Sequence, residues 1–172
     1  QFGMDKWHET ISTKEFESVL FFKNHGPMSG GSIRHPHSQI IGLRNYDYHE
    51  DITVKNMNGW LLHEDQDIRI TLSKHPIIGF FEYNLRYKPD APVRSIAMRL
   101  QQTIRYVLDS LAKFSQSYNY FFYQLEDGYE YIKVIPRYIT TPLYVGYKIP
   151  QTCNDERAAK ILQNITPYFE LK

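Results

Sequence analysis

The sequence predicts an α+β fold, in which an antiparallel sheet is covered by a few helices. Short apolar or alternating runs bounded by turn residues recur along the chain, as strands do. Other segments space their apolar residues at helical intervals. The chain has 172 residues, of which 42% are hydrophobic and 23% charged. That composition is typical of a globular protein, and the length predicts about one domain.

The first strands are expected in the N-terminal quarter. Ser18 to Phe22 is a short β-branched and aromatic run, and His37 to Leu43 is a second one. The segment between them, residues 23–32, is rich in glycine and predicts a loop, so the three parts form a hairpin-like unit. Further strands are predicted at residues 60–65, 68–75, 77–87, 118–125, 130–138 and 144–149, with a hairpin turn at Glu126-Asp127-Gly128.

Three helices are expected around these strands. Residues 2–11 have a loose helical spacing, and residues 93–111 form the longest regular pattern, introduced by Pro89 and Pro92. A last helix should begin at Asn154 or Asp155, which can cap it, and carry its apolar face on Ala158, Ile161, Leu162 and Ile165. Residues 44–58 are polar and predict a connection.

Charge, cysteine content and hydropathy exclude several classes. Twenty Lys and Arg against nineteen Asp and Glu give a net charge of +1, which argues against a protein that grips long nucleic acid. One cysteine, Cys153, allows no intrachain disulfide and no zinc-binding cysteine pair, which favours a reducing, cytoplasmic setting. No apolar run reaches the roughly 18 residues of a membrane span. The opening residues read like the middle of a helix, so we expect a natural start further upstream.

One segment, Phe21 to Ile40, gathers residue types that handle phosphate. His35 and His37 are two apart, so on a strand they would share one face, and Gln39 would continue it. The backbone amides of a glycine-rich loop can approach an anion closely. The remaining contributors are Lys23, Asn24, Gly30, Gly31, Ser32 and Arg34.

Each part of this segment also has an ordinary interpretation. A His-x-His pair alone is often a surface feature or a metal site, and a glycine-rich loop alone is usually a turn. The combination in a fixed order is more specific, so it favours a phosphate-handling site.

The same residues resemble a known family. Asn24, Ser32 and His35-Pro36-His37-Ser38-Gln39 match the HPHxQ signature of the galactose-1-phosphate uridylyltransferase family, within the histidine-triad superfamily. The resemblance is strong over residues 18–43, and the stretch IKVIPRYITTPLYVGYKI adds a weaker match. An uncharacterised bacterial branch of the family is more similar to the chain than the sugar enzyme is.

The resemblance implies a histidine-triad-like (HIT-like) antiparallel sheet with flanking helices, built from two related lobes. Residues 1–58 would be the C-terminal part of a first lobe with the HPHxQ hairpin, and residues 59–172 a complete second lobe. In such a truncated lobe, Phe21 and Ile41 would be exposed to solvent. Because members of the family are commonly dimers, we expect a homodimer that buries them.

The resemblance also assigns roles. His37 matches the nucleophile that takes a nucleoside monophosphate from its donor, and Gln39 matches a residue that hydrogen-bonds a phosphate oxygen. Asn24 and Ser32 match phosphate contacts, beside Gly31 and Arg34, and His35 matches a ligand of a structural zinc in members that hold the metal. Chemistry agrees, because a neutral imidazole is a competent nucleophile near pH 7 once its other nitrogen donates to an acceptor.

The expected activity is nucleotidyl transfer through a covalent nucleotidyl-histidine, with a nucleotide or nucleotide sugar as substrate. Gln39 stands where related hydrolases have a histidine, and it cannot donate a proton in the same way, which favours an acceptor other than water. Two alternatives stay open: a dinucleoside polyphosphate phosphorylase or hydrolase, and a nucleotide-binding module without catalysis. The second rests on Tyr129 and Tyr131, which stand where many relatives carry a His-x-His pair.

Overall fold

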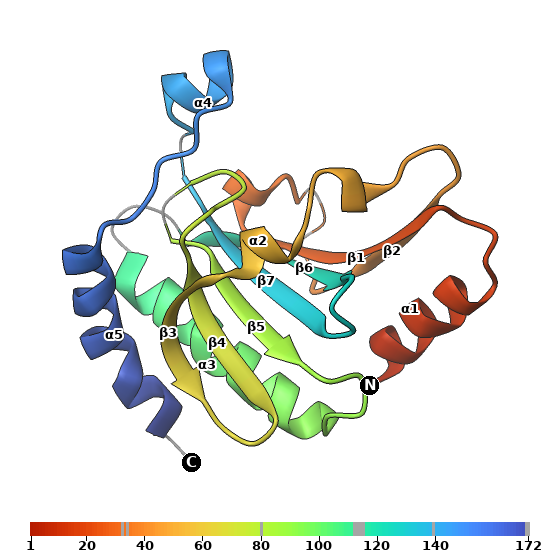
Figure 1. Ribbon diagram of the computed structural model, residues 1–172, viewed down its shortest axis with the longest axis horizontal. Helices are drawn as coiled ribbons and strands as arrows, with labels where there is room; N and C mark the ends of the chain where they lie inside the picture. The colour runs from red at the N-terminus through yellow and green to blue at the C-terminus, as the bar shows by residue number, and fades with distance from the viewer. Residues whose placement is uncertain (32, 34, 80, 112–115, 139, 171–172) are drawn as a thin grey trace.

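The computed structural model describes residues 1–31, 33, 35–79, 81–111, 116–138 and 140–170. Within them, seven strands form one antiparallel sheet in the order β2-β1-β6-β7-β5-β4-β3 (Figure 1), which confirms the α+β prediction. The strands are β1 (Ser18–His25), β2 (Gln39–Leu43), β3 (Gly59–Glu64), β4 (Ile68–Ser73), β5 (Tyr83–Tyr87), β6 (Ser117–Gln124) and β7 (Glu130–Arg137). The helices are α1 (Phe2–Ser12), α2 (Val54–Met57), α3 (Val93–Leu111), α4 (Pro142–Tyr147) and α5 (Asp155–Glu170), with short 3₁₀ turns η1 (Pro27–Ser29) and η2 (Tyr48–Glu50).

The predicted hairpin at residues 18–43 is present. β1 and β2 are antiparallel, with Phe22 opposite Gln39 and Ser18 opposite Leu43. The other edge of β1 pairs with β6, where Asn24 lies opposite Asn119. This second pairing makes the hairpin part of the main sheet.

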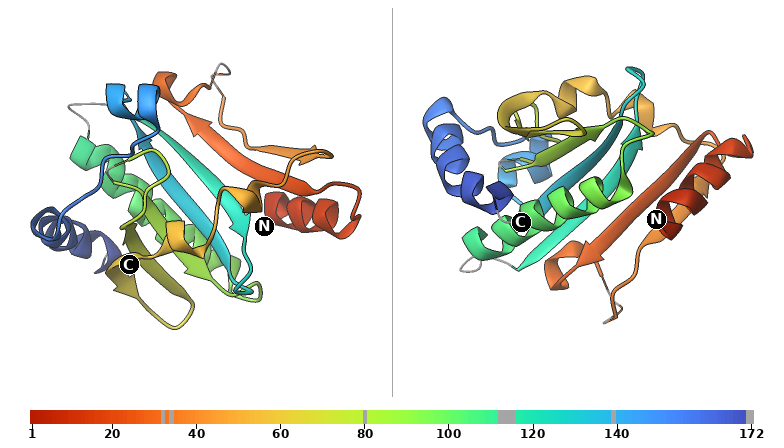
Figure 2. Two further views of the ribbon diagram at one scale, coloured as in Figure 1. Left: turned by 45° about the horizontal axis from the view of Figure 1, so that its top comes forward. Right: turned by 90° about the horizontal axis from the view of Figure 1, so that it is seen from below.

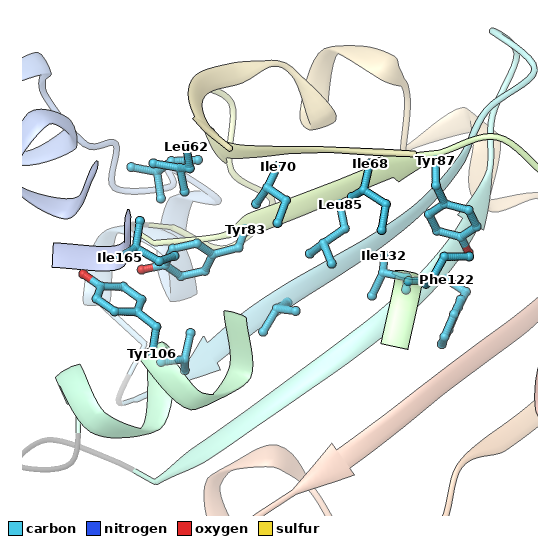
Figure 3. Packing of buried hydrophobic residues seen from close by; sticks show 14 of the residues in the cluster. Leu62, Ile68, Ile70, Tyr83, Leu85, Tyr87, Tyr106, Phe122, Ile132 and Ile165 are labelled. Carbon is cyan, nitrogen blue, oxygen red and sulfur yellow. The ribbon is translucent and has the colours of Figure 1, made fainter. Parts of the chain in front are cut away.

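Helices α1 and α3 cover one face of the sheet (Figure 2), and the main core lies beneath them. Trp7 of α1 is fully buried, and its indole Nε1 donates to the Val19 carbonyl at 3.0 Å. Phe21 and Phe122 stack beneath it with ring centroids 4.2 Å apart. Figure 3 shows the core continuing from the central strands toward α3 and α5. Phe21 is therefore covered within the chain, contrary to our expectation, whereas Ile41 is 40% exposed.

The opposite face is covered by the connection at residues 44–58. Tyr48 and Met57 from this segment pack against Tyr123 and Tyr131 of the sheet. The segment predicted as a plain polar connection thus closes a second, smaller core.

Three predicted strands differ from the structure. Residues 144–149 lie mostly in helix α4, because Thr141 Oγ1 accepts from the Tyr144 amide at 3.2 Å and Pro142 begins the first turn. None of the α4 residues is buried, so strand propensity had no sheet to join. The strand predicted at 77–87 begins only at Tyr83, and the strand predicted at 37–43 begins at Gln39.

The last helix agrees with the sequence at its start. Asn154 Oδ1 accepts from the Arg157 amide at 2.9 Å, so Asn154 is the cap. Ala158, Ile161 and Ile165 are buried as predicted, but Leu162 is 39% exposed. No helix in the described ranges is long and apolar enough to cross a membrane.

A fully buried ion pair joins the middle of the sheet to the loop before β5. Lys133 Nζ lies 3.1 Å from Glu82 Oε2, and both side chains are fully buried. Lys133 also donates to Ser73 and Asn84 at 2.6 Å each. Burial lowers the pKa of Lys133, and the Glu82 carboxylate acts in the opposite direction. Glu82 in turn accepts from the backbone amides of residues 77, 78 and 79, which is why these residues do not extend β5.

Replacing one member of this pair should destabilise the protein severely. Lys133→Met or Glu82→Gln leaves a buried polar group or charge without its partner, at a cost of about 3–5 kcal/mol in the free energy of unfolding. The double variant should cost less than the sum of the two, as urea denaturation would show. A single-variant cost below about 1 kcal/mol would contradict this account.

A second prediction concerns Asp65 in the β3–β4 turn. Burial opposes its ionisation, but hydrogen bonds from the Ile68 and Asp67 amides, His63 and Arg99 outweigh it and lower the pKa of Asp65 to about 2. Arg99 lies on α3 and also donates to the Phe169 carbonyl of α5 at 2.9 Å. The carboxylate therefore connects a turn to two helices.

The folded-state pKa of Asp65 lies below its ordinary value of 3.8, so its contribution to stability is present above that value and is lost as pH falls toward about 2. Asp65→Asn should lower the free energy of unfolding near neutral pH by about 1 kcal/mol, allowing for solvent screening. Asp67→Asn is the control, because Asp67 joins the turn through its backbone amide. Urea denaturation near neutral pH and near pH 2 tests this. If Asp65→Asn lowers the free energy of unfolding equally at both pH values, the account is wrong.

Candidate functional site

The glycine-rich loop is anchored to the start of β6. Gly26 and Gly30 adopt positive φ angles of 79° and 80°, which side chains disfavour. A Cβ on Gly26 would also lie 2.4 Å from Ser117 Oγ. That hydroxyl accepts from the Met28 amide at 3.1 Å. The loop therefore follows a defined path from Asn24 to Gly31.

His37 has the hydrogen bond that a nucleophilic imidazole needs. Its Nδ1 lies 3.0 Å from the His35 carbonyl oxygen. A carbonyl can only accept, so Nδ1 carries a proton, and in the neutral ring the lone pair is then on Nε2. The acceptor that the second ring nitrogen needs is therefore the backbone carbonyl of the other histidine of the motif.

His35 is exposed, and its ring lies edge-on to that of His37 with centroids 5.7 Å apart. Both histidines precede β2, so the face shared by His35, His37 and Gln39 on one strand, as expected from spacing, is not formed as a strand ladder. Ser38, the residue between His37 and Gln39, interacts with the Tyr120 hydroxyl. Burial of Tyr120 raises its pKa and outweighs the lowering effect of Ser38, so the hydroxyl stays protonated.

His37 lies at an apolar groove between two helices, which we call the α1–α3 groove. It has a volume of about 530 Å³. Phe21, Phe122 and Ile132 lie along its sheet side, and Phe2 and Ala97 contribute from the helices. Lys23 borders the groove too, and its Nζ donates to the His37 carbonyl at 3.4 Å.

Asn24, Gly31 and His35 line a neighbouring cavity of about 560 Å³, which we call the loop pocket. Lys23 and Pro36 border both cavities. The structure thus places Asn24, Gly31 and His35 around the loop pocket, and His37 in the lining of the adjacent α1–α3 groove. Gln39 borders neither cavity, but it lies opposite Phe22 and therefore shares a sheet face with Asn24. Two predicted phosphate contacts, Ser32 and Arg34, lie outside the described residues.

Asn119 is a site-supporting residue that sequence reasoning missed. It is 2% exposed, and its Nδ2 donates to Asn24 Oδ1 at 2.6 Å. Arg137 donates to Asn119 Oδ1 at 2.8 Å. The available signal was one amide inside the aromatic run Tyr118 to Tyr123, where a polar residue needs a buried partner.

The residues fit a zinc site poorly. Among the described residues, no group of three His, Cys, Asp or Glu side chains could hold a metal ion. Cys153 is buried in the main core. The zinc role of His35 stays a prediction, and no step below uses a metal.

Two family models match almost the whole chain. The model described as "Domain of unknown function (DUF4931) C-terminal domain" matches residues 49–169, and its N-terminal counterpart matches residues 1–46. The chain belongs to the DUF4931 family. A crystal structure of a DUF4931 family protein from Bacillus cereus is 38% identical, with a TM-score of 0.84 over 99% of this chain and 77% of that one.

The DUF4931 fold also resembles an enzyme structure. A structure described as a uridylyltransferase mutant is similar with a TM-score of 0.71 and 15% identity, over 95% of this chain and 68% of that one. At this identity the likeness shows the fold alone. No curated protein matches the sequence.

Proposed function

We propose that the chain is a nucleotidyltransferase that carries a nucleoside monophosphate on His37. The observation that carries this proposal is the imidazole itself. Its Nδ1 donates to the His35 carbonyl, which directs the lone pair of Nε2 away from the backbone, beside a cavity large enough for a nucleoside. The fold shared with a uridylyltransferase supports the same class of reaction.

The reaction has two displacements. His37 Nε2 attacks the α-phosphorus of a nucleoside diphosphate sugar, a P–N bond forms, and the P–O bond to the sugar phosphate breaks. The proton on Nδ1 stays in place, where the His35 carbonyl stabilises the positive charge that the ring acquires. A phosphate oxygen of the acceptor then attacks the same phosphorus, and the P–N bond breaks to restore neutral His37.

The cavities suit the two ends of such a donor. The apolar α1–α3 groove offers Phe2, Phe21 and Phe122 to a nucleoside. The loop pocket offers the Asn24 amide and the loop backbone to phosphate oxygens, with Lys23 between the two cavities. We assign phosphate contacts to Gln39, Asn24, Gly31, Ser32 and Arg34 as part of this proposal, and the homodimer and the cytoplasmic setting likewise stay predictions.

Intact mass spectrometry tests the covalent step. After incubation with a panel of nucleoside diphosphate sugars and dinucleoside polyphosphates, the protein should gain the mass of one nucleoside monophosphate. His37→Gly should lose the adduct, with partial rescue of turnover by added imidazole. The exposed His75→Gly is the control and should keep the adduct. An adduct of equal rate in His37→Gly would overturn the mechanism.

The residues that donate hydrogen bonds to the phosphate should contribute to the rate in a fixed order. Gln39→Ala should slow single turnover about a hundredfold, because one donor to the phosphoryl oxygens is lost. Asn24→Ala and Ser32→Ala should have smaller effects. Adding inorganic phosphate or a sugar phosphate to the isolated adduct separates a phosphorylase from a transferase.

Filling the α1–α3 groove should block the donor without touching the imidazole. Ala97 borders the groove and is exposed, so Ala97→Trp should raise the donor concentration for half-maximal adduct formation by roughly tenfold or more. Met98→Trp, one residue along α3 and outside the groove lining, should leave it unchanged. If both variants need the same donor concentration for half-maximal adduct formation, the nucleoside does not bind in this groove.

A further inference from the structure

We propose that Arg137 and Asn119 are positioning residues that fix the direction of the Asn24 amide, so that it presents a donor to an anion in the loop pocket. This inference rests on the proposed function and adds the reason why Asn24 would present a hydrogen-bond donor, and not an acceptor, to the phosphate.

The three residues form a row across three neighbouring strands. Asn24 on β1 lies opposite Asn119 on β6, and Arg137 reaches Asn119 from β7. Asn119 is 2% exposed, so its amide exchanges no hydrogen bonds with solvent. All three contacts of its side chain are within the protein, because its Nδ2 also donates to the Ser29 carbonyl at 3.0 Å.

The chemistry of arginine sets the direction of the whole row. A guanidinium has donors and no acceptor, so the Asn119 oxygen must face Arg137. The Asn119 nitrogen must then face Asn24, whose oxygen accepts. Asn24 is left with its Nδ2 as the outward group, and this atom has no acceptor within the described residues.

An outward donor is what a phosphoryl oxygen requires. Asn24 borders the loop pocket with Gly31, whose neighbourhood is fixed by the bond from Asn119 to Ser29. The buried Asn119 amide therefore positions the Asn24 side chain, and it also holds the turn at Ser29 that precedes the backbone amide of Gly31. A role in packing alone would not depend on which end of each amide faces which partner, and this difference makes the proposal testable.

The decisive variant is Asn119→Asp, which keeps the shape and the bond from Arg137 but cannot donate. The Asn24 amide should then turn its nitrogen toward the new carboxylate and its oxygen toward the pocket. The probes are AMP, GMP, CMP and UMP with their nucleosides, measured by calorimetry. For the monophosphate that wild type binds best, Asn119→Asp should weaken binding by about 10- to 100-fold, the scale of a hydrogen bond to a charged group.

The matching nucleoside is the control, because it lacks the phosphate and should bind both proteins alike. Arg137→Lys keeps a donor and should bind the monophosphate nearly as wild type does, whereas Arg137→Met should weaken it. These two variants also decide the question if Asn119→Asp does not fold. If wild type, Asn119→Asp and Arg137→Met bind the monophosphate equally, the positioning role is overturned and the proposed function still stands. Failure of wild type to bind any of the four would count against both.

Discussion

The pairing of β1 with β6 is the interaction on which the rest of the molecule depends. Without it, the N-terminal hairpin would be two strands and one helix, too little to bury an apolar face by itself. With it, Phe21 stacks on Phe122 under Trp7, and α1 is fixed on the same face as α3. The same pairing sets Asn24 beside Asn119. One line of backbone hydrogen bonds thus produces the groove, the loop anchor and the amide row.

Much of this fold could be predicted from local patterns, because most strands alternate and α3 carries a long helical stripe. The hairpin at residues 18–43, the cap at Asn154 and the acceptor for His37 were accessible because each depends on neighbours in sequence. Residues 144–149 were predicted wrongly because Tyr, Val and Ile favour strands, while the Thr141 cap and Pro142 favour a helix start, and no residue of α4 is buried.

The candidate site was predictable only in part. The motif gave His37, Gln39 and Asn24, but strand periodicity assumed that β2 reaches His35, and the strand begins at Gln39. The division into groove and pocket depends on α1 and α3, which are distant in sequence. The contact between Asn119 and Arg137 was hidden for the same reason, since it comes from the β1–β6–β7 register and not from any local pattern.

The Glu82–Lys133 pair has a consequence for how the protein opens. Three amides of the loop before β5 are held by one carboxylate, and that carboxylate is held by an ammonium on β7. Releasing residues 77–79 alone would take three hydrogen-bond donors from a carboxylate that stays buried against Lys133, so these residues cannot fray as surface segments usually do. The amide hydrogens of residues 77–79 should exchange with solvent only when the sheet itself separates. A segment without regular secondary structure would then belong to the slowest-exchanging unit of the molecule.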